Sequence, residues 1–163
     1  MTKNLLSRRS ALFVIALLFL PLISAFAAEP INTLEKKRFF GYAPNGIAIR
    51  GYDTVAYFTQ SKPVKGSDSY TTQWMGATWK FSSQEHLDLF VAEPDKYAPQ
   101  YGGYCAYGVA VGDLVKIEPE FWTIHNDKLY LNYNKKLNNT WLEDIDGYVS
   151  TADGEFDSLL KSQ

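Results

Sequence analysis

The residues best suited to chemistry are a small set of soft and nitrogen ligands that remain once an apolar N-terminal stretch is set aside. They are the sole cysteine, both histidines and one methionine: Cys105, His86, His125 and Met75. Thiolate, imidazole and thioether groups are the ligand types of copper sites. The sequence therefore predicts a soft-metal site with copper as the expected cofactor, Cys105 as the principal ligand and His86 as the second. A Cu(I) site made of Cys105 and one further ligand requires only two side chains to come within bonding distance, whereas the larger site requires all four.

A second hypothesis uses the aromatic residues around the cysteine. The candidate ligand-contacting residues are four tyrosines and one aspartate: Tyr97, Tyr101, Tyr104, Tyr107 and Asp53. Such residues predict a non-catalytic module whose aromatic pocket holds a small ligand or a partner peptide. Two structural interpretations stay open beside the functional ones. Cys105 can be a small buried hydrophobe, and Asp53, at a turn, can cap backbone N–H groups.

The histidines also have ordinary structural interpretations. His86 falls in the first turns of a predicted helix, where the helix dipole disfavours a charged ring and makes a neutral, hydrogen-bonded or metal-bound ring easier to accommodate. His125 borders a predicted hairpin turn, which favours an exposed side chain. A thiol enzyme ranks last, because a nucleophilic cysteine needs a nearby base and one cysteine cannot run a dithiol cycle. No catalytic residue is assigned, since phosphate-loop, nucleophile-elbow and His-x-x-x-His signatures do not occur.

Turn signals and hydrophobic periodicity predict the elements that must position these residues. Alternating and β-branched runs predict strands near residues 47–58, 70–81, 104–111 and 121–133. Ser82 and Glu85 form a capping box that predicts a helix over 83–92. Helical spacing predicts two helices within 138–160, separated near 150–154. The expected fold is a single α+β domain, with a small and mainly antiparallel sheet flanked by helices.

The N-terminus has the three-part pattern of a secretory signal. Basic residues precede an apolar run over 11–23, and the small residues of a cleavage site follow at positions 25 and 27. The run is short and contains Pro21, so we expect cleavage after Ala27 rather than a permanent membrane anchor. Arg8-Arg9 loosely resembles a twin-arginine motif, which leaves the general secretory and twin-arginine routes both open. The expected organisation is a signal peptide at 1–27, a lead-in segment at 28–45, and one domain with C-terminal helices at 46–163.

The charge of the mature chain argues against nucleic acid as a partner. Removing residues 1–27 takes away three basic residues and leaves 13 basic against 18 acidic residues, a formal charge of −5. Nucleic-acid binding depends on basic patches that neutralise phosphates. The expected partners are therefore a metal ion or a small ligand, and a single cysteine excludes an internal disulfide.

Five runs of residues carry a family resemblance. They are Gly51-Tyr-Asp-Thr-Val-Ala-Tyr-Phe58, Lys62-Pro-Val-Lys-Gly66, Met75-Gly-Ala-Thr-Trp-Lys-Phe-Ser82, Phe90-Val-Ala-Glu-Pro-Asp-Lys-Tyr-Ala-Pro-Gln-Tyr-Gly-Gly-Tyr-Cys-Ala-Tyr107 and Lys128-Leu-Tyr-Leu-Asn-Tyr133. Together they resemble the exported YHS-domain proteins of bacteria. The resemblance implies a small α+β domain and an association with metals, because related modules occur in copper- and heavy-metal-handling proteins. The export signal adds the expectation of a periplasmic location.

The chain departs from the metal-binding members of that family at the ligand positions. In those modules, a segment near the start resembles Asp-Pro-Val-Cys, and a segment before the helix resembles Phe-Cys-x-x-x-Cys. This chain has Asp53-Thr-Val-Ala56 and Phe81-Ser-Ser-Gln-Glu-His86 instead. The resemblance therefore does not carry the family's metal site over, and His86 offers a ligand only in place of the last cysteine.

Overall fold

The computed structural model describes residues 28–37 and 41–162, and within them the chain mixes short strands and helices. Its strands form three two-stranded antiparallel sheets. The pairs are β1 (Leu34–Lys36) with β2 (Tyr42–Pro44), β3 (Ser67–Trp74) with β4 (Ala77–Phe81), and β5 (Trp122–His125) with β6 (Lys128–Leu131). The expected α+β class with antiparallel strands is confirmed, with the strands divided among three hairpin-like pairs. The expected signal peptide lies outside the described residues.

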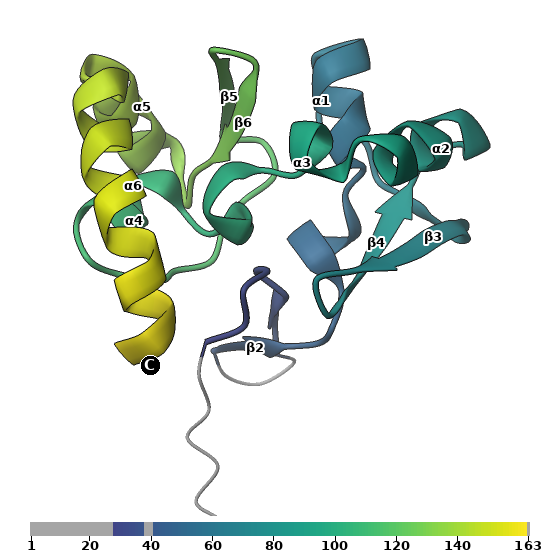
Figure 1. Ribbon diagram of the computed structural model, residues 1–163, viewed down its shortest axis with the longest axis horizontal. Coiled ribbons are helices and arrows are strands. Elements are labelled where there is room, and N and C mark those ends of the chain that lie inside the picture. Colours follow the sequence, from purple (N-terminus) through teal and green to yellow (C-terminus); the bar gives the residue numbers. More distant parts are fainter. Residues whose placement is uncertain (1–27, 38–40, 163) are drawn as a thin grey trace, which may run out of the picture.

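The described part of the chain also contains α-helices and short 3₁₀ helices. They are η1 (Ala48–Gly51), α1 (Thr54–Gln60), α2 (Gln84–Ala92), α3 (Pro94–Tyr97), η2 (Gln100–Gly103), α4 (Ala106–Ala110), α5 (Lys135–Glu143) and α6 (Ile145–Ser162). Figure 1 shows α4, α5 and α6 together at one side, α1, α2 and α3 at the other, and the β5–β6 pair between them. Among the described residues, no helix is both long and apolar enough to cross a membrane.

The two predicted hairpins over 70–81 and 121–133 are confirmed. Their turns lie at Met75-Gly76 and Asn126-Asp127, and all four residues have positive φ angles, between 48° and 79°. Two-residue hairpin loops need this left-handed backbone because its twist matches that of the flanking strands. The chemistry of the turn therefore specifies both hairpins locally.

Two predicted strands, over 47–58 and 104–111, are wrong, because both segments are mainly helical. In the first, Asp53 is the N-cap of α1 and accepts hydrogen bonds from the backbone of Val55 and Ala56. In the second, the Cys105 sulfur accepts from the Gly108 backbone at the start of α4. Both helices are short and largely buried. A short apolar run does not distinguish a buried helix from a strand.

The remaining helices follow their predicted signals with shifted ends. The helix predicted over 83–92 is α2, but its N-cap is Ser83 rather than Ser82, since the Ser83 side chain accepts from the His86 backbone. The two C-terminal helices divide at Asp144, not near 150–154, and Gly154 lies within α6. Isolated glycine weakens a helix by only about 1 kcal/mol relative to alanine, so tertiary packing overrides it.

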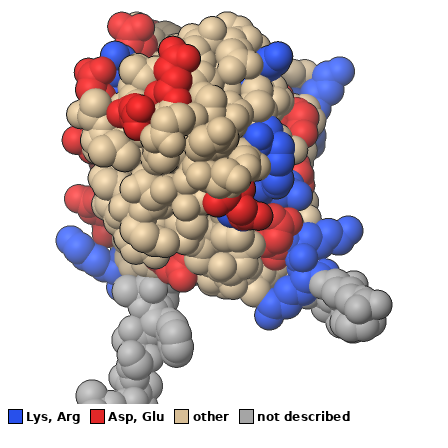
Figure 2. Space-filling view, turned by 90° about the vertical axis from the view of Figure 1, so that its right-hand side faces the viewer, with Lys and Arg blue, Asp and Glu red and all other residues tan. Residues whose placement is uncertain are grey.

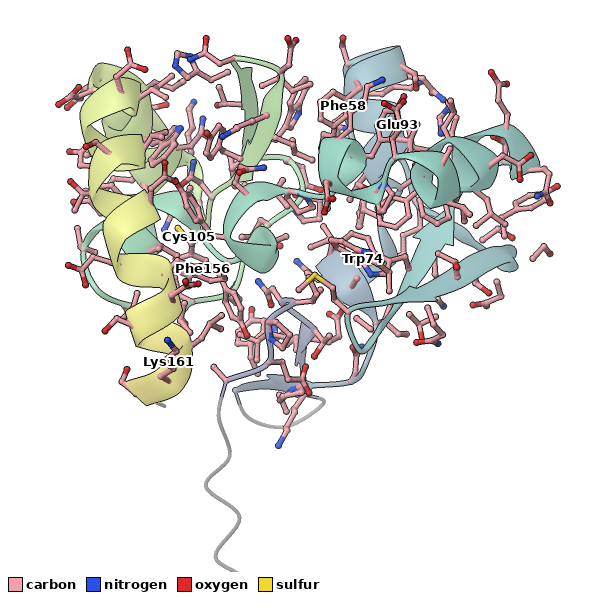
Figure 3. The ribbon with its side chains drawn as sticks, in the orientation of Figure 1. Phe58, Trp74, Glu93, Cys105, Phe156 and Lys161 are labelled. Carbon is pink, nitrogen blue, oxygen red and sulfur yellow. The ribbon has the colours of Figure 1, made fainter. Side chains whose placement is uncertain are left out.

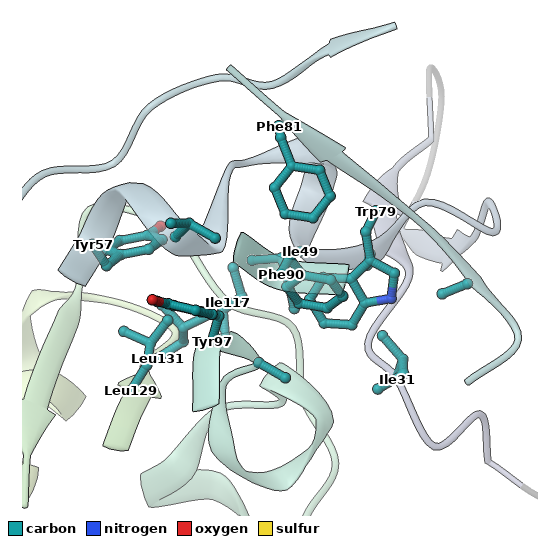
Figure 4. Packing of buried hydrophobic residues seen from close by; sticks show 14 of the residues in the cluster. Ile31, Ile49, Tyr57, Trp79, Phe81, Phe90, Tyr97, Ile117, Leu129 and Leu131 are labelled. Carbon is teal, nitrogen blue, oxygen red and sulfur yellow. The ribbon is translucent and has the colours of Figure 1, made fainter. Parts of the chain in front are cut away.

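Two hydrophobic clusters form the core. The first extends from β4 and α2, with Trp79, Phe81 and Phe90, to β6, with Leu129 and Leu131 (Figure 4). The second is organised around Trp141, with Tyr130 and Tyr148 packed against its ring. Large aromatic side chains thus supply the buried surface that a domain without disulfides needs. Figure 2 shows the face at the right of Figure 1, a broad uncharged area with charged side chains mostly toward its edges.

The Gly102-Gly103 pair is the point where the N-terminal segment crosses the rest of the chain. Asn32 donates hydrogen bonds from its backbone to Gly102 O at 2.8 Å and from its side chain to Gly103 O at 2.9 Å. A Cβ on Gly102 would lie 1.9 Å from the carbonyl oxygen of Pro30, and one on Gly103 would lie 2.2 Å from Ile49. Gly102 therefore serves the close packing of two backbones, and Gly103 leaves room for the Ile49 side chain.

Candidate functional site

Cys105 is fully buried at the start of α4. Its sulfur lies 3.5 Å from Asn132 Oδ1, to which the thiol donates, and 3.4 Å from the Gly108 backbone N–H. Burial raises the pKa of the Cys105 thiol, and the hydrogen bond from Gly108 offsets part of this effect. The thiol therefore favours its protonated form, which binds metals and attacks electrophiles poorly. Sequence reasoning missed Asn132, because its contact with Cys105 depends on tertiary structure.

The four predicted metal ligands lie in separate parts of the molecule. Figure 3 shows Cys105 beside α4 and α6, whereas His86 belongs to α2 on the opposite side. Met75 is 52% exposed at a hairpin turn. His125 Nε2 lies 2.8 Å from Asp146 Oδ1. Within residues 28–37 and 41–162, no three His, Cys, Asp or Glu side chains are placed to hold a metal ion together.

A closed hydrogen-bond network surrounds Asp53, which is fully buried, and His86, which is nearly so. Asp53 Oδ1 accepts from the backbone N–H groups of Val55 and Ala56. Asp53 Oδ2 accepts from His86 Nδ1 at 2.6 Å and from both the backbone and the hydroxyl of Ser82, at 2.8 and 2.6 Å. The prediction of Asp53 as a cap is confirmed, and the carboxylate also ties the end of β4 to α2.

The other nitrogen of His86 is also engaged. Nε2 lies 3.1 Å from Thr59 Oγ1, and that hydroxyl in turn donates to the Val55 carbonyl at 3.1 Å. Metal-bound histidines usually hydrogen-bond a carboxylate through one nitrogen and keep the other for the metal. Here both ring nitrogens lie within hydrogen-bond distance of a protein oxygen, so neither is left open toward a metal ion. The residues present do not fit a metal ion in this network.

Comparison with protein families gives one match. Residues 55–101 match the YHS domain. The chain contains a YHS domain. The matched range begins in α1, includes the β3–β4 hairpin, α2 and α3, and ends in η2. No curated protein and no solved structure matches the chain.

The four tyrosines proposed as a pocket pack into the protein interior. The Tyr101 and Tyr104 hydroxyls donate to Asp153 and to the Glu29 carbonyl, both at 2.9 Å. The Tyr97 ring packs edge-on against Phe58, and that of Tyr107 against Tyr148. With Asp53 engaged as a cap, these five side chains stabilise the domain at several separate places. They do not gather around one described hollow.

An aromatic hollow does exist on the surface, outside the part of the chain that matches the YHS domain. It has a volume of about 370 Å³ and is lined by Leu34, Tyr42, Leu114, Val115, Lys116 and Tyr133. The ammonium of Lys116 lies 4.2 Å from the centre of the Tyr42 ring and 4.3 Å from that of Tyr133. Sequence reasoning missed this site, because its residues come from distant segments of the chain.

A chain of charged side chains holds Lys116 in place. Lys116 Nζ donates to Glu118 at 2.6 Å, and Glu118 also pairs with Arg50, which pairs with Glu35 at 3.4 Å. Burial acts to lower the pKa of Lys116, but the contacts with Glu118 and Tyr42 outweigh it and raise the pKa. The lysine therefore remains a cation between two tyrosine rings, a favourable cation–π arrangement.

Proposed function

We propose that this protein is a non-catalytic binding module whose ligand is a small organic acid with an apolar body. The Lys116 ammonium, fixed between Tyr42 and Tyr133 in a hollow of about 370 Å³, carries this proposal. Small-ligand pockets are mostly apolar and contain a few fixed polar groups, with volumes from about 300 Å³ upward. The hollow has these properties.

The chemistry of the lining sets the ligand class. Leu34, Leu114 and Val115 provide apolar contact for the body of the ligand, and the two tyrosines, each 37% exposed, provide flat walls. One ammonium N–H of Lys116 is used by Glu118, and an ammonium has three. A carboxylate can accept one of the others as a charge-assisted hydrogen bond, which is stronger than a bond between neutral groups.

Titration with paired small molecules tests the proposal. The purified protein is titrated by calorimetry with benzoate and hexanoate, and with benzamide and hexanamide as uncharged matches. We expect the acids to bind more tightly than the amides, and Lys116→Met to weaken acid binding about tenfold, the loss of one charge-assisted hydrogen bond. The matched control is Lys96→Met, because Lys96 also pairs with a glutamate and lies over a tyrosine ring, away from the hollow. No binding of either acid, or equal affinity in the Lys116→Met variant, would reject the site.

Soft-metal handling through Cys105 is the second candidate, and the match of residues 55–101 to the YHS domain supports it. Specifically, this candidate is a periplasmic copper accessory protein that binds Cu(I) through Cys105. Competition against a Cu(I) chelator tests it directly. If wild type and Cys105→Ser compete equally, copper binding through this thiol is excluded.

A further inference from the structure

We infer that the hydrogen bonds around the Asp53 carboxylate connect this YHS domain as metal–ligand bonds connect the metal-binding YHS modules, so that the domain is held together without a metal. These hydrogen bonds lie outside the hollow around Lys116. Three residues stand where the metal-binding modules resemble cysteine-containing motifs: Ala56, Ser82 and His86.

The structure brings these three positions together around one carboxylate. Ala56 donates its backbone N–H to Asp53 Oδ1 at 3.2 Å. Ser82 and His86 bond to Oδ2 of the same carboxylate, and their side chains lie 3.4 Å apart. The backbone of Ala56 in α1, the side chain of Ser82 after β4 and the side chain of His86 in α2 therefore meet at one carboxylate.

The centre is filled by protein groups instead of a cation. Asp53 accepts five hydrogen bonds, two on Oδ1 and three on Oδ2. The side chain of Asp53 is 0% exposed and that of His86 is 7% exposed. Ala56 has no ligand atom in its side chain, and a serine hydroxyl is a weak ligand for soft metals. A metal ion would have to displace bonds that a buried carboxylate cannot replace from water.

The network connects secondary-structure elements, as a structural metal does. Asp53 caps α1, fixes the residue that follows β4 and orients a side chain of α2, so it links three elements that meet in the core. A structural zinc site links elements in the same way, through thiolate and imidazole ligands. Here five hydrogen bonds to one carboxylate connect the elements, where a structural metal would use metal–ligand bonds.

Metal dependence of the wild-type protein is the first test. We expect the unfolding temperature to be the same with EDTA, with Zn²⁺ and with no addition, and Co²⁺ to give no ligand-field absorption. The inference is overturned if EDTA lowers the unfolding temperature, or if about one equivalent of Co²⁺ binds and His86→Gln abolishes that binding.

Restoring the thiols is the second test. We expect the triple variant Ala56→Cys, Ser82→Cys, His86→Cys to bind about one Co²⁺ or Zn²⁺ with thiolate-to-cobalt absorption, because zinc-type sites accept three sulfur ligands and a fourth group. The matched control is Ala56→Ser with His86→Ser, which places oxygen at all three positions and should bind neither ion. A folded triple variant that takes up no metal would show that the positions do not converge as described. If the triple variant does not fold, the wild-type measurement alone decides whether the domain needs a metal.

Discussion

Substituting Gly102 with alanine tests the packing that joins the N-terminal segment to the rest of the domain. Gly102 has a φ angle of +59°, and a Cβ there would lie 1.9 Å from the carbonyl oxygen of Pro30. A left-handed alanine costs roughly 1–2 kcal/mol. Because the clash is with backbone, the segment must also move away and lose the two hydrogen bonds of Asn32, each contributing roughly 0.5–1.5 kcal/mol. The expected total loss of unfolding free energy is roughly 2–5 kcal/mol.

The control is Gly112→Ala. Gly112 has a φ angle of +88°, and nothing lies within 4 Å of the position that a Cβ would take, so this residue shares the backbone cost without the clash. Both variants also share the smaller conformational entropy that alanine gives the unfolded chain. The difference between them isolates the close approach, and we expect it to be roughly 1–3 kcal/mol, from the two hydrogen bonds alone.

Urea unfolding, followed by tryptophan fluorescence, measures these differences. A second arm adds Asn32→Ala to each background. If Gly102→Ala has already displaced the segment, Asn32→Ala should cost much less in that background than in wild type, a coupling expected only between contacting residues. Equal losses for Gly102→Ala and Gly112→Ala, with fully additive effects of Asn32→Ala, would refute the packing described here.

Three further predictions follow from single side chains. Cys105, which is 0% exposed and whose pKa is raised by burial, should react with a thiol reagent only after unfolding, and equal rates in the native and denatured protein would contradict its burial. Burial raises the pKa of Tyr104 to about 12, above the value of about 10 of an unfolded tyrosine, so its stabilisation is complete below about pH 10 and is lost as the pH rises toward 12. Between about pH 9 and about pH 11 wild type should lose more unfolding free energy than Tyr104→Phe, and parallel losses would argue against the shift. Ser83→Ala should cost about 1 kcal/mol by removing the N-cap of α2, whereas Ser83→Asp, which keeps an acceptor, should retain most of the stability; equal losses would argue against the cap.

The parts of the fold that the sequence predicted correctly depend on local signals. Met75-Gly76 and Asn126-Asp127 specify their hairpins, because the left-handed backbone of a two-residue turn depends on the two residues in that turn. The serines before α2 signalled its start to within one residue, because an N-cap contacts backbone only a few positions away. The segments 47–58 and 104–111 were misassigned because short buried runs carry no periodicity that separates helix from strand.

The sequence by itself determined which groups can do chemistry: one thiol, two imidazoles and an excess of acidic residues. Tertiary structure alone decided what these groups contact. It placed Cys105 against Asn132, joined His86 to Asp53 across 33 positions, and brought Tyr42, Lys116 and Tyr133 to one hollow. Such contacts depend on how the hydrophobic clusters assemble, because each side chain lies where the packing of distant elements leaves room for it. Residue types therefore limit the chemistry, and long-range packing selects which part of it the protein presents.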